Sequence, residues 1–239
     1  MTTMNTVTAP VLCPDYDSYL RFEWEKFINE PERASALLDL AGDIPVTRVL
    51  DIGCGAGQEL LPFLTKKDAF GFGIDVAPDV GQVGREMYAR DAPEANINFL
   101  RADAENLPFP SEYFDVIICR LALPYTHNAT AFAEVSRVLR PGGKYFLKIS
   151  GVRWYLLELK QALKERKPLS VIHASRVLVA GALYHLTRRQ PRWRIPSRET
   201  FQSRWLLGRE LSRHGLSIRG KTPDSNAVTP SFVIVKESS

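Results

Sequence analysis

The chain has 239 residues, 45% hydrophobic and 24% charged, which predicts one soluble globular domain with insertions. The N-terminus, MTTMNTVTAPVL, has no basic region followed by an apolar run, so we expect no signal peptide and a cytoplasmic location. Cys13, Cys54 and Cys119 form no CxxC pair or His/Cys cluster, which argues against a zinc site and against a disulfide framework.

The charge is unevenly distributed along the chain. Residues 1–150 contain 14 Lys and Arg against 21 Asp and Glu, a net charge of −7. Residues 151–196 contain 10 against 2, a net charge of +8, and residues 197–239 contain 7 against 4. A basic block of this kind is either a solvated helix face or a surface that meets nucleic acid, lipid or another anion.

The first 45 residues are expected to form a small helical cap. Tyr16 to Leu40 follow a helical pattern that breaks at NEPER, where Pro31 suits the first turn of a second helix.

Five apolar, strand-like runs then alternate with helical stretches as far as residue 150. The expected strands are 47–53, 69–77, 97–104, 114–123 and 144–150. The expected helices are 58–64, 81–90 and 130–139, and RPGG at 140–143 is expected to form a turn before the fifth strand. This alternation predicts a parallel sheet wrapped by helices.

The basic segment 151–196 is expected to be a helical lid inserted into the core. Its first helix has apolar residues at helical spacing, namely Val152, Leu156, Leu159 and Leu163. A second helix is expected from Ser170 to Arg188. Its longest apolar stretch falls short of the ~20 residues that a membrane span requires and contains Arg176, so we expect no transmembrane helix. Attachment to a membrane surface stays open, beside a plain solvated face.

The last 43 residues are expected to return to the core formed by residues 46–150. A helix from Ser197 to His214 precedes two more strands, 216–222 and 231–237. The whole pattern predicts an α/β fold of the Rossmann-like, doubly wound type, with a seven-stranded and mostly parallel sheet, an N-terminal helical cap, a core of 46–150 with 197–239, and a lid at 151–196.

The stretch VLDIGCGAGQE, from Val49 to Glu59, places three glycines between a strand and a helix. Such a loop lets a ligand approach main-chain N–H groups, although a tight structural turn would need the same residues. Asp75 follows 18 residues after Gly57, at the end of the second strand, where a carboxylate can accept hydrogen bonds from both hydroxyls of a ribose. A glycine loop followed by an acid at this position is compatible with binding of NAD, FAD or S-adenosylmethionine.

Four motifs in order, VLDIGCGAG, the acid of GIDVA, LRADAENLPFPSEYFDVII and RVLRPGGKYFL, resemble the class I S-adenosylmethionine-dependent methyltransferases, in particular the branch of ubiquinone and small-molecule methyltransferases. The resemblance covers about residues 46–150. A dinucleotide-binding enzyme would instead carry GxGxxG.

The resemblance implies S-adenosylmethionine as cofactor, S-adenosylhomocysteine as product, and a set of binding roles. Its methionine portion and ribose would lie against Gly53, Cys54, Gly55 and Gly57. Asp51 would orient the amino group, and Asp75 would hold the ribose. The adenine would meet Val76, Asp103 and Ala104, while Arg120 and Leu121 would lie beside the amino-acid end and the transferable methyl. Asp51 and Asp103 have an alternative role as turn or helix caps.

The resemblance leaves the catalytic base open. Family members often carry a His pair after the fourth strand, whereas this chain reads ALPYTHN, so Tyr125 and His127 are the candidates for lining the acceptor pocket. His173, in the lid, could also reach the site, although a lone His on a half-apolar helix is more often structural. The N-terminal cap would close over the cofactor, with Arg33 placed to pair with its carboxylate.

The predicted function is therefore in-line methyl transfer to a small, apolar or aromatic acceptor, with no metal and no stable nucleic acid partner. The basic lid keeps RNA methylation as an alternative, and the altered PYTHN segment keeps a non-catalytic S-adenosylmethionine- or S-adenosylhomocysteine-binding module. A third alternative, a NAD-dependent oxidoreductase, is supported only by the glycine loop and by Asp75, the acid expected to bind a ribose. The oligomeric state has no signal in the sequence.

Overall fold

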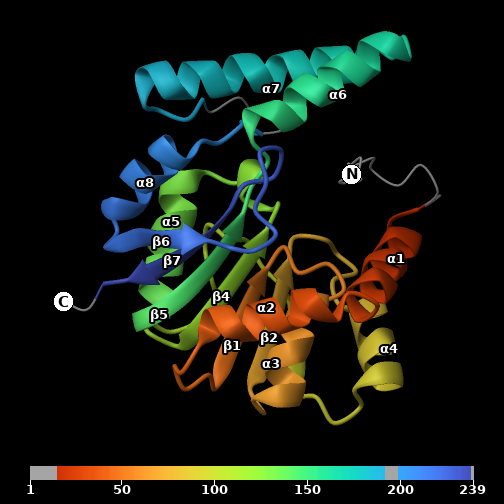
Figure 1. The fold of residues 1–239 in the computed structure, drawn as a ribbon, viewed down its shortest axis with the longest axis vertical. Coiled ribbons are helices and arrows are strands. Elements are labelled where there is room, and N and C mark those ends of the chain that lie inside the picture. The colour runs from red at the N-terminus through yellow and green to blue at the C-terminus, as the bar shows by residue number, and fades with distance from the viewer. Residues whose placement is uncertain (1–14, 192–198, 238–239) are drawn as a thin grey trace, which may run out of the picture.

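A seven-stranded sheet forms the centre of the protein (Figure 1). The structure is a computed structural model and describes residues 15–191 and 199–237. The strand order is β3-β2-β1-β4-β5-β7-β6, with β7 antiparallel to both of its neighbours and the other pairs parallel. The strands are β1 Arg48–Ile52, β2 Phe70–Asp75, β3 Ile97–Arg101, β4 Phe114–Arg120, β5 Leu139–Lys148, β6 Leu216–Lys221 and β7 Ser231–Lys236. The predicted Rossmann-like, mostly parallel sheet is confirmed.

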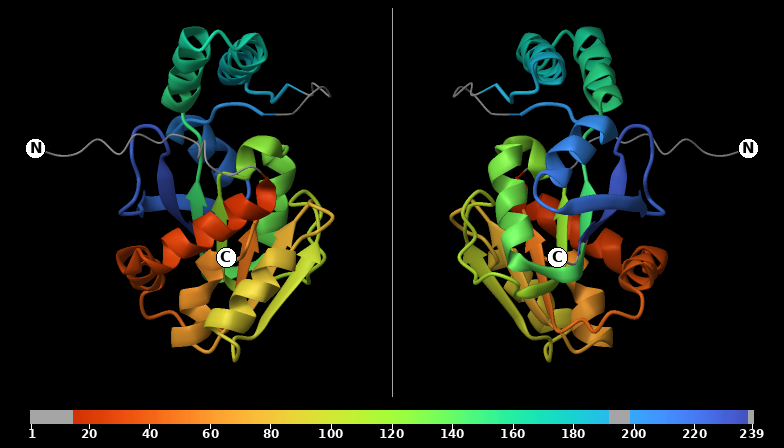
Figure 2. Two further views of the ribbon diagram at one scale, coloured as in Figure 1. Left: turned by 90° about the vertical axis from the view of Figure 1, so that its right-hand side faces the viewer. Right: turned by 90° about the vertical axis from the view of Figure 1, so that its left-hand side faces the viewer.

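Helices cover both faces of the sheet (Figure 2). One face packs against α1 Tyr16–Ile28, α2 Pro31–Ala41, α3 Leu61–Lys66 and α4 Gln82–Asp91. The other face packs against α5 Asn128–Val138 and α8 Arg204–Ser212. Each face of the sheet has its own hydrophobic core, and neighbouring residues of a strand point into different ones. In β4, Val116 packs on the side of α1 to α4 and Ile117 on the side of α5 and α8. This division explains the uninterrupted apolar runs of the central strands, because both faces of a parallel sheet are buried.

The two N-terminal helices are held at different places, α1 against α4 and α2 against β5, where Lys144 Nζ donates to the carbonyl of Leu40 at 2.8 Å. Asp15 caps α1 by accepting a hydrogen bond from the backbone N–H of Ser18 at 2.8 Å, and Pro31 occupies the first turn of α2 as predicted. Trp24 packs edge-on against Tyr88 of α4 and donates its indole N–H to Asp91 at 2.7 Å. The first helix of the predicted cap therefore lies beside the strand that ends at Asp75.

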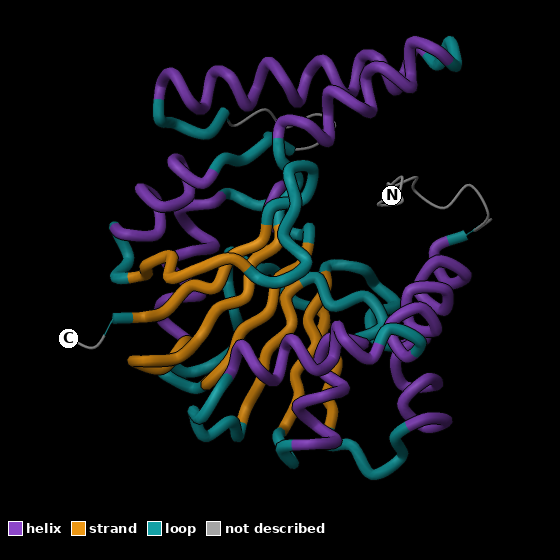
Figure 3. Tube along the Cα trace, viewed as in Figure 1, coloured by secondary structure: helices purple, strands orange, loops and turns teal. Residues whose placement is uncertain are grey.

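Two helices form a hairpin after the fifth strand, α6 Val152–Lys164 and α7 Pro168–Thr187. We call Val152–Thr187 the α6–α7 hairpin. Because α6 follows β5 after three residues, the hairpin stands beyond the carboxyl end of this strand and apart from the helices that cover the sheet (Figure 3). The helical prediction for this insertion is confirmed, while the division of the chain into domains stays a prediction.

Three local predictions need correction. The last helix begins at Arg204, because Ser203 caps it by accepting from the backbone N–H of Leu206; the predicted cap, Ser197, lies outside the described residues. RPGG forms no turn ahead of β5 but an irregularity inside it, where the register with β4 shifts and Gly142 has a φ of +74°. The helix predicted at 58–64 begins as a 3-10 turn, η1 Gln58–Leu60.

Candidate active site

The glycine loop runs from the end of β1 to η1 and packs closely against protein atoms. Gly53, Gly55 and Gly57 have φ values of +69°, +55° and +79°, a region that other residues adopt at a cost. A Cβ on Gly53 would lie 2.4 Å from the Cβ of Ala122, so a side chain there would collide with the segment that follows β4. The backbone N–H groups of Gly53 and Cys54 donate to the carbonyl of Ile74 at 2.8 and 3.0 Å, which ties the loop to the end of β2.

Asp51 lies behind this loop as a buried carboxylate. Its exposed fraction is 2%, and its side chain accepts no hydrogen bond from the described residues. Burial raises its pKa well above the usual range, the negative charges of Glu59 and Asp75 raise it further, and Arg120 and Arg33 oppose them. A buried carboxylate of this kind is suited to receive a cationic group, and the structure gives it no cap role.

Asp75 stands at the tip of β2, next to the loop. Its Oδ1 accepts a hydrogen bond from the backbone N–H of Ala77 at 3.1 Å, which fixes the carboxylate, while Oδ2 accepts none from the described residues. Val76, the next residue, is 64% exposed. Asp75 and Gly55 line a small cavity of about 10 Å³ together with Tyr16 and Leu20 of α1. The first helix therefore covers the space between the glycine loop and the acid.

Three other predicted binding residues, Asp103, Ala104 and Cys54, are already in contact with protein atoms. Asp103 accepts a hydrogen bond from the backbone N–H of Glu105 at 2.9 Å, so it does cap a turn, and Ala104 beside it is buried. Burial raises the pKa of the Cys54 thiol well above its usual range, and its sulfur packs against Gly73. The thiol is thus unreactive, as expected from a residue chosen for its size.

A charged network that the sequence analysis missed lies next to Asp51. Glu59, buried just after the glycine loop, forms ion pairs with Arg33 of α2 and with Arg120 at the end of β4, the latter at 2.9 Å. Arg120 also pairs with Asp224 at 2.7 Å, and Lys148 at the end of β5 pairs with the same carboxylate at 2.7 Å. The position of Glu59 after GAGQ was a usable signal, but Asp224 comes from the distant loop between β6 and β7.

This network is not fully satisfied. Two of its buried side-chain atoms, Arg33 Nε and Glu59 Oε2, have no hydrogen-bond partner among the described residues. Although partial burial opposes ionisation, Arg120 and Lys148 hold the pKa of Asp224 well below its usual range. Asp224 therefore stays ionised at neutral pH, and Arg33 Nε remains as an N–H donor without a partner among the described residues.

Leu121 joins the end of β4 to the loop that meets Gly53. Its φ is +65°, which is costly for a residue with a branched side chain, and its backbone N–H donates to the carbonyl of Lys148 at 2.8 Å. Strain of this kind is concentrated at functional sites. The residue that the resemblance places beside the transferable methyl is thus held in an unusual conformation by its neighbours.

Tyr125 and His127 lie in the segment after β4, in different surroundings. Tyr125, in η2 Leu123–Tyr125, is 59% exposed, and its pKa is raised to about 12 by desolvation of the phenol and by the charges of Glu199 and Glu158. His127 precedes α5, and its Nδ1 is 2.9 Å from the hydroxyl of Thr130 in the first turn of that helix. His127 is therefore bound locally, whereas Tyr125 faces the acids of the hairpin region.

A second polar cluster joins the α6–α7 hairpin to the segment before α8. The hydroxyl of Tyr155 donates to Glu199 Oε1 at 2.7 Å, and Nε2 of His173 lies 3.3 Å from Glu199 Oε2. Burial and the neighbouring Glu199 raise the pKa of Glu158, and His173 opposes them. Tyr155 and Glu199 are buried, so this cluster is fixed by the fold. No local sequence signal predicts it, because Glu199 and His173 are joined only by the tertiary structure.

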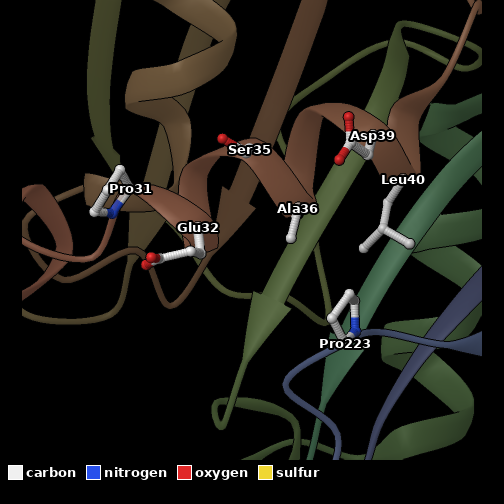
Figure 4. Close-up of a pocket in the computed structure, with 7 residues that line it drawn as sticks. All are labelled: Pro31, Glu32, Ser35, Ala36, Asp39, Leu40 and Pro223. Atoms are coloured by element: carbon white, nitrogen blue, oxygen red, sulfur yellow. The ribbon is translucent and has the colours of Figure 1, made fainter.

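A larger hollow of about 550 Å³ lies between α2 and the loop before β7 (Figure 4). Its lining includes Glu32, Ser35, Asp39 and Pro223, and none of the predicted site residues. The strand ends and the glycine loop are therefore the better candidate for the active site. Within the described ranges, no group of three or more His, Cys, Asp or Glu side chains is arranged to hold a metal ion.

Comparison with known proteins finds a domain family that includes the glycine loop. Residues 49–143 match the methyltransferase domain family. The ubiquinone/menaquinone biosynthesis C-methyltransferase UbiE of Ectopseudomonas mendocina is 36% identical over 115 residues, which are 45% of this chain and 43% of that protein. The chain thus matches less than half of the length of this curated relative.

Solved structures share the fold over most of the chain. A methyltransferase of Haloferax volcanii, in complex with the Trm112 methyltransferase activator, superposes with a TM-score of 0.60 at 17% identity, covering 94% of this chain and 98% of its own. Geranyl diphosphate C-methyltransferase of Streptomyces coelicolor, in complex with Mg²⁺, geranyl diphosphate and S-adenosylhomocysteine, gives 0.59 at 13% identity, covering 87% and 77%. Residues 49–143 thus match a methyltransferase domain, and they lie in a chain with a Rossmann-like fold.

Proposed function

We propose that this protein transfers a methyl group from S-adenosylmethionine to a small, apolar or aromatic acceptor. The observation that carries the proposal is the buried carboxylate of Asp51, which accepts no hydrogen bond from the described residues and lies behind a loop of three glycines with positive φ. Leaving such a group without a partner costs stability, which supports a ligand as its partner.

The residues present fit S-adenosylmethionine. Asp51 matches its ammonium group, Arg33 Nε supplies a free donor for its carboxylate, and Asp75 Oδ2 is free to accept from the ribose hydroxyls. The glycine loop with Cys54 would take the methionine portion, and the exposed Val76 would pack on the adenine.

Three further assignments complete the binding site. Asp103 and Ala104 would meet the adenine edge, although Asp103 would have to keep its turn-capping hydrogen bond at the same time. Arg120 would lie beside the amino-acid end through its ion pair with Glu59, and Leu121 beside the methyl. Because Tyr16 and Leu20 of α1 close the cavity next to Asp75, this helix has to shift outward when the cofactor enters.

When bound, S-adenosylmethionine supplies a methyl group already activated by a sulfonium, so the protein's tasks are to hold the acceptor in line and to accept its proton. Proximity and orientation alone can lower such a barrier by roughly 7–11 kcal/mol. Dedicated covalent catalysis is therefore unnecessary, and the acceptor pocket matters most.

We assign proton removal to His173, oriented by Glu199. Histidine is the usual base near neutral pH, and a carboxylate on Nε2 leaves Nδ1 to accept the proton. Tyr155 holds the same carboxylate from its other side. Tyr125, whose pKa is raised to about 12, stays protonated at neutral pH and would donate a hydrogen bond to the acceptor. His127 is the weaker candidate, because its ring partner is the neutral hydroxyl of Thr130 and not a carboxylate.

Other features support a small acceptor in the cytoplasm. The relatives named above are C-methyltransferases of ubiquinone/menaquinone biosynthesis and of geranyl diphosphate. The side of the hairpin next to the core carries Tyr155 and Tyr184, which are aromatic and buried. Cys54 and Cys119 are free thiols, which suits a reducing compartment.

Isothermal titration with S-adenosylmethionine tests the first half of the proposal. The parent should bind, Asp75→Ala should bind at least about tenfold more weakly, and Asp43→Ala, which alters an exposed acid far from the loop, should match the parent. Absence of binding by the parent, or equal binding by Asp75→Ala, would remove the proposal.

Methyl transfer tests the second half. Tritium-labelled S-adenosylmethionine is incubated with the protein and a cell extract, which is then separated into organic-soluble metabolites, aqueous metabolites and RNA. Label in the organic-soluble fraction is the expected result. Label confined to RNA would favour the RNA methyltransferase, and cofactor binding without transfer to any fraction would favour the non-catalytic module.

A further inference from the structure

The outer surface of the α6–α7 hairpin has no role in the proposed function. The hairpin projects beyond the strands (Figures 1 and 3). Its base is anchored to the core, where Gln190 accepts from the backbone N–H of Asn128 at 2.8 Å and donates to the carbonyl of Thr126 at 2.7 Å. From its unusual surface we infer that the hairpin docks the protein onto an anionic lipid bilayer.

A stripe of aliphatic residues runs along the outer side of α7. Its members are separated by three or four residues, or by seven across Arg176, and therefore lie on one side of the helix: Leu169, Ile172, Val179, Leu183 and Leu186. Leu169 is 81% exposed, Leu186 79% and Ile172 65%. The opposite side is buried against α6 and Phe201, and a Cβ on Gly181 would lie 2.2 Å from that ring. The exposed stripe therefore has no partner among the described residues.

The outer side of α6 repeats this pattern. Val152, Leu156 and Leu163 follow the spacing of one helix face, and all three are exposed, as is Leu157 beside them. The sequence analysis predicted the helical spacing of these residues, and the structure places their side chains at the surface. A large apolar patch on a soluble protein marks a site of interaction with a protein or a membrane.

The charge of the hairpin selects between these partners. Residues 152–189 contain eight Lys and Arg and two Glu. Arg153, Lys160 and Lys164 are exposed along α6 next to its apolar stripe, and Arg166 and Lys167 are exposed at the turn between the helices. Aliphatic residues flanked by basic ones complement a bilayer with anionic headgroups, where each Lys or Arg near the surface adds about 1 kcal/mol. RNA would match the charge but would leave the aliphatic stripes uncovered.

The hairpin is expected to rest on the bilayer without crossing it. Within the described ranges, α7 is the one helix long and apolar enough to span a membrane. However, its inner side carries His173 bound to Glu199, and His185 Nε2 lies 2.7 Å from the hydroxyl of Ser203, so insertion would break contacts with the core. Only the outer stripes are free to enter the interface.

Vesicle flotation of the full chain tests this inference. The probes are vesicles of phosphatidylcholine alone and of phosphatidylcholine mixed with phosphatidylglycerol. We expect the parent to float with the anionic vesicles, and less so as salt is raised. Leu169→Gln/Leu186→Gln and Lys160→Glu/Lys164→Glu should each weaken binding about tenfold or more.

Matched variants and a second measurement make the result interpretable. Ile28→Gln/Phe70→Gln and Lys66→Glu/Lys67→Glu change exposed residues away from the hairpin and should float like the parent. Circular dichroism should give the same spectrum for all variants. Failure of the parent to bind anionic vesicles, or equal binding by the hairpin variants, overturns the inference. A dimer that Leu169→Gln/Leu186→Gln dissolves, without vesicle binding, would assign the stripes to a second copy and overturn it as well. S-adenosylmethionine binding is a separate readout, so either proposal can fail alone.

Discussion

The glycine-loop edge of the sheet and the α6–α7 hairpin depart from an ordinary soluble fold in opposite ways. At the glycine loop, charged groups are buried: Asp51 is 2% exposed, and Glu59 is enclosed by two arginines. On the hairpin, apolar groups are exposed while the charges face solvent. Each departure costs stability or solubility in the isolated protein, and each cost disappears if a partner is bound, a small cationic ligand at the loop and a lipid surface at the hairpin.

The buried inner side of the hairpin should have the largest effect on catalysis. We expect His173→Asn to lower the rate of labelled methyl transfer about 10²- to 10⁴-fold with S-adenosylmethionine binding unchanged, because it removes the proposed base. His214→Asn, at the end of α8, serves as the control and should keep the parent rate. An unchanged rate in His173→Asn would show that His173 is not the base and that its contact with Glu199 is structural.

The glycine loop should be intolerant of the smallest side chain. Gly53→Ala adds a Cβ that meets Ala122 and forces alanine into a positive φ, so the free energy of unfolding should fall by about 2–3 kcal/mol in urea denaturation. Gly220→Ala, where a Cβ meets nothing within 4 Å, should change it little. Equal effects at the two positions would contradict the close packing described for the loop.

A substitution at Asp75 should weaken ligand binding and leave stability unchanged. Asp75→Asn should weaken S-adenosylmethionine binding by about 1.5–3 kcal/mol, roughly 10- to 100-fold, because hydrogen bonds from the ribose would then meet a neutral group. Thermal unfolding without ligand should barely change, since Asp75 Oδ2 has no partner among the described residues. A large fall in the melting temperature would mean that the acid is structural.

Asp51 should show the opposite signs for stability and for binding. Its raised pKa means that the folded state disfavours the ionised form, a cost that is present above the usual carboxyl pKa of about 4 and vanishes as the pH falls below it. Asp51→Asn should therefore raise the free energy of unfolding by about 1–2 kcal/mol at neutral pH, with no gain in acid, while S-adenosylmethionine binding weakens. Destabilisation at neutral pH would show that the carboxylate has a partner in the free protein.

The smallest expected effect concerns the anchor of the hairpin. Ser203→Ala removes the cap of α8 and the hydrogen bond with His185, which should lower the free energy of unfolding by about 1 kcal/mol. Ser212→Ala, at the exposed end of the same helix, is the matched control. If Ser203→Ala lowers both stability and vesicle binding while Ser212→Ala lowers neither, this hydrogen bond is needed to hold the aliphatic stripes in their exposed position.

The sequence by itself determined the features that local patterns encode. Apolar runs of five to ten residues between turns predicted the strands, since both faces of a parallel sheet are buried. GCGAG predicted the loop, because glycine adopts a positive φ at little steric cost, and Asp75 ends the second strand as predicted. The tertiary structure alone decided which distant residues meet. Glu59 with Asp224 around Arg120, and His173 with Glu199, are joined by packing of elements far apart in the chain. It also decided that the aliphatic stripes of α6 and α7 face outward, because periodicity gives the position of an apolar face on a helix but not what covers it.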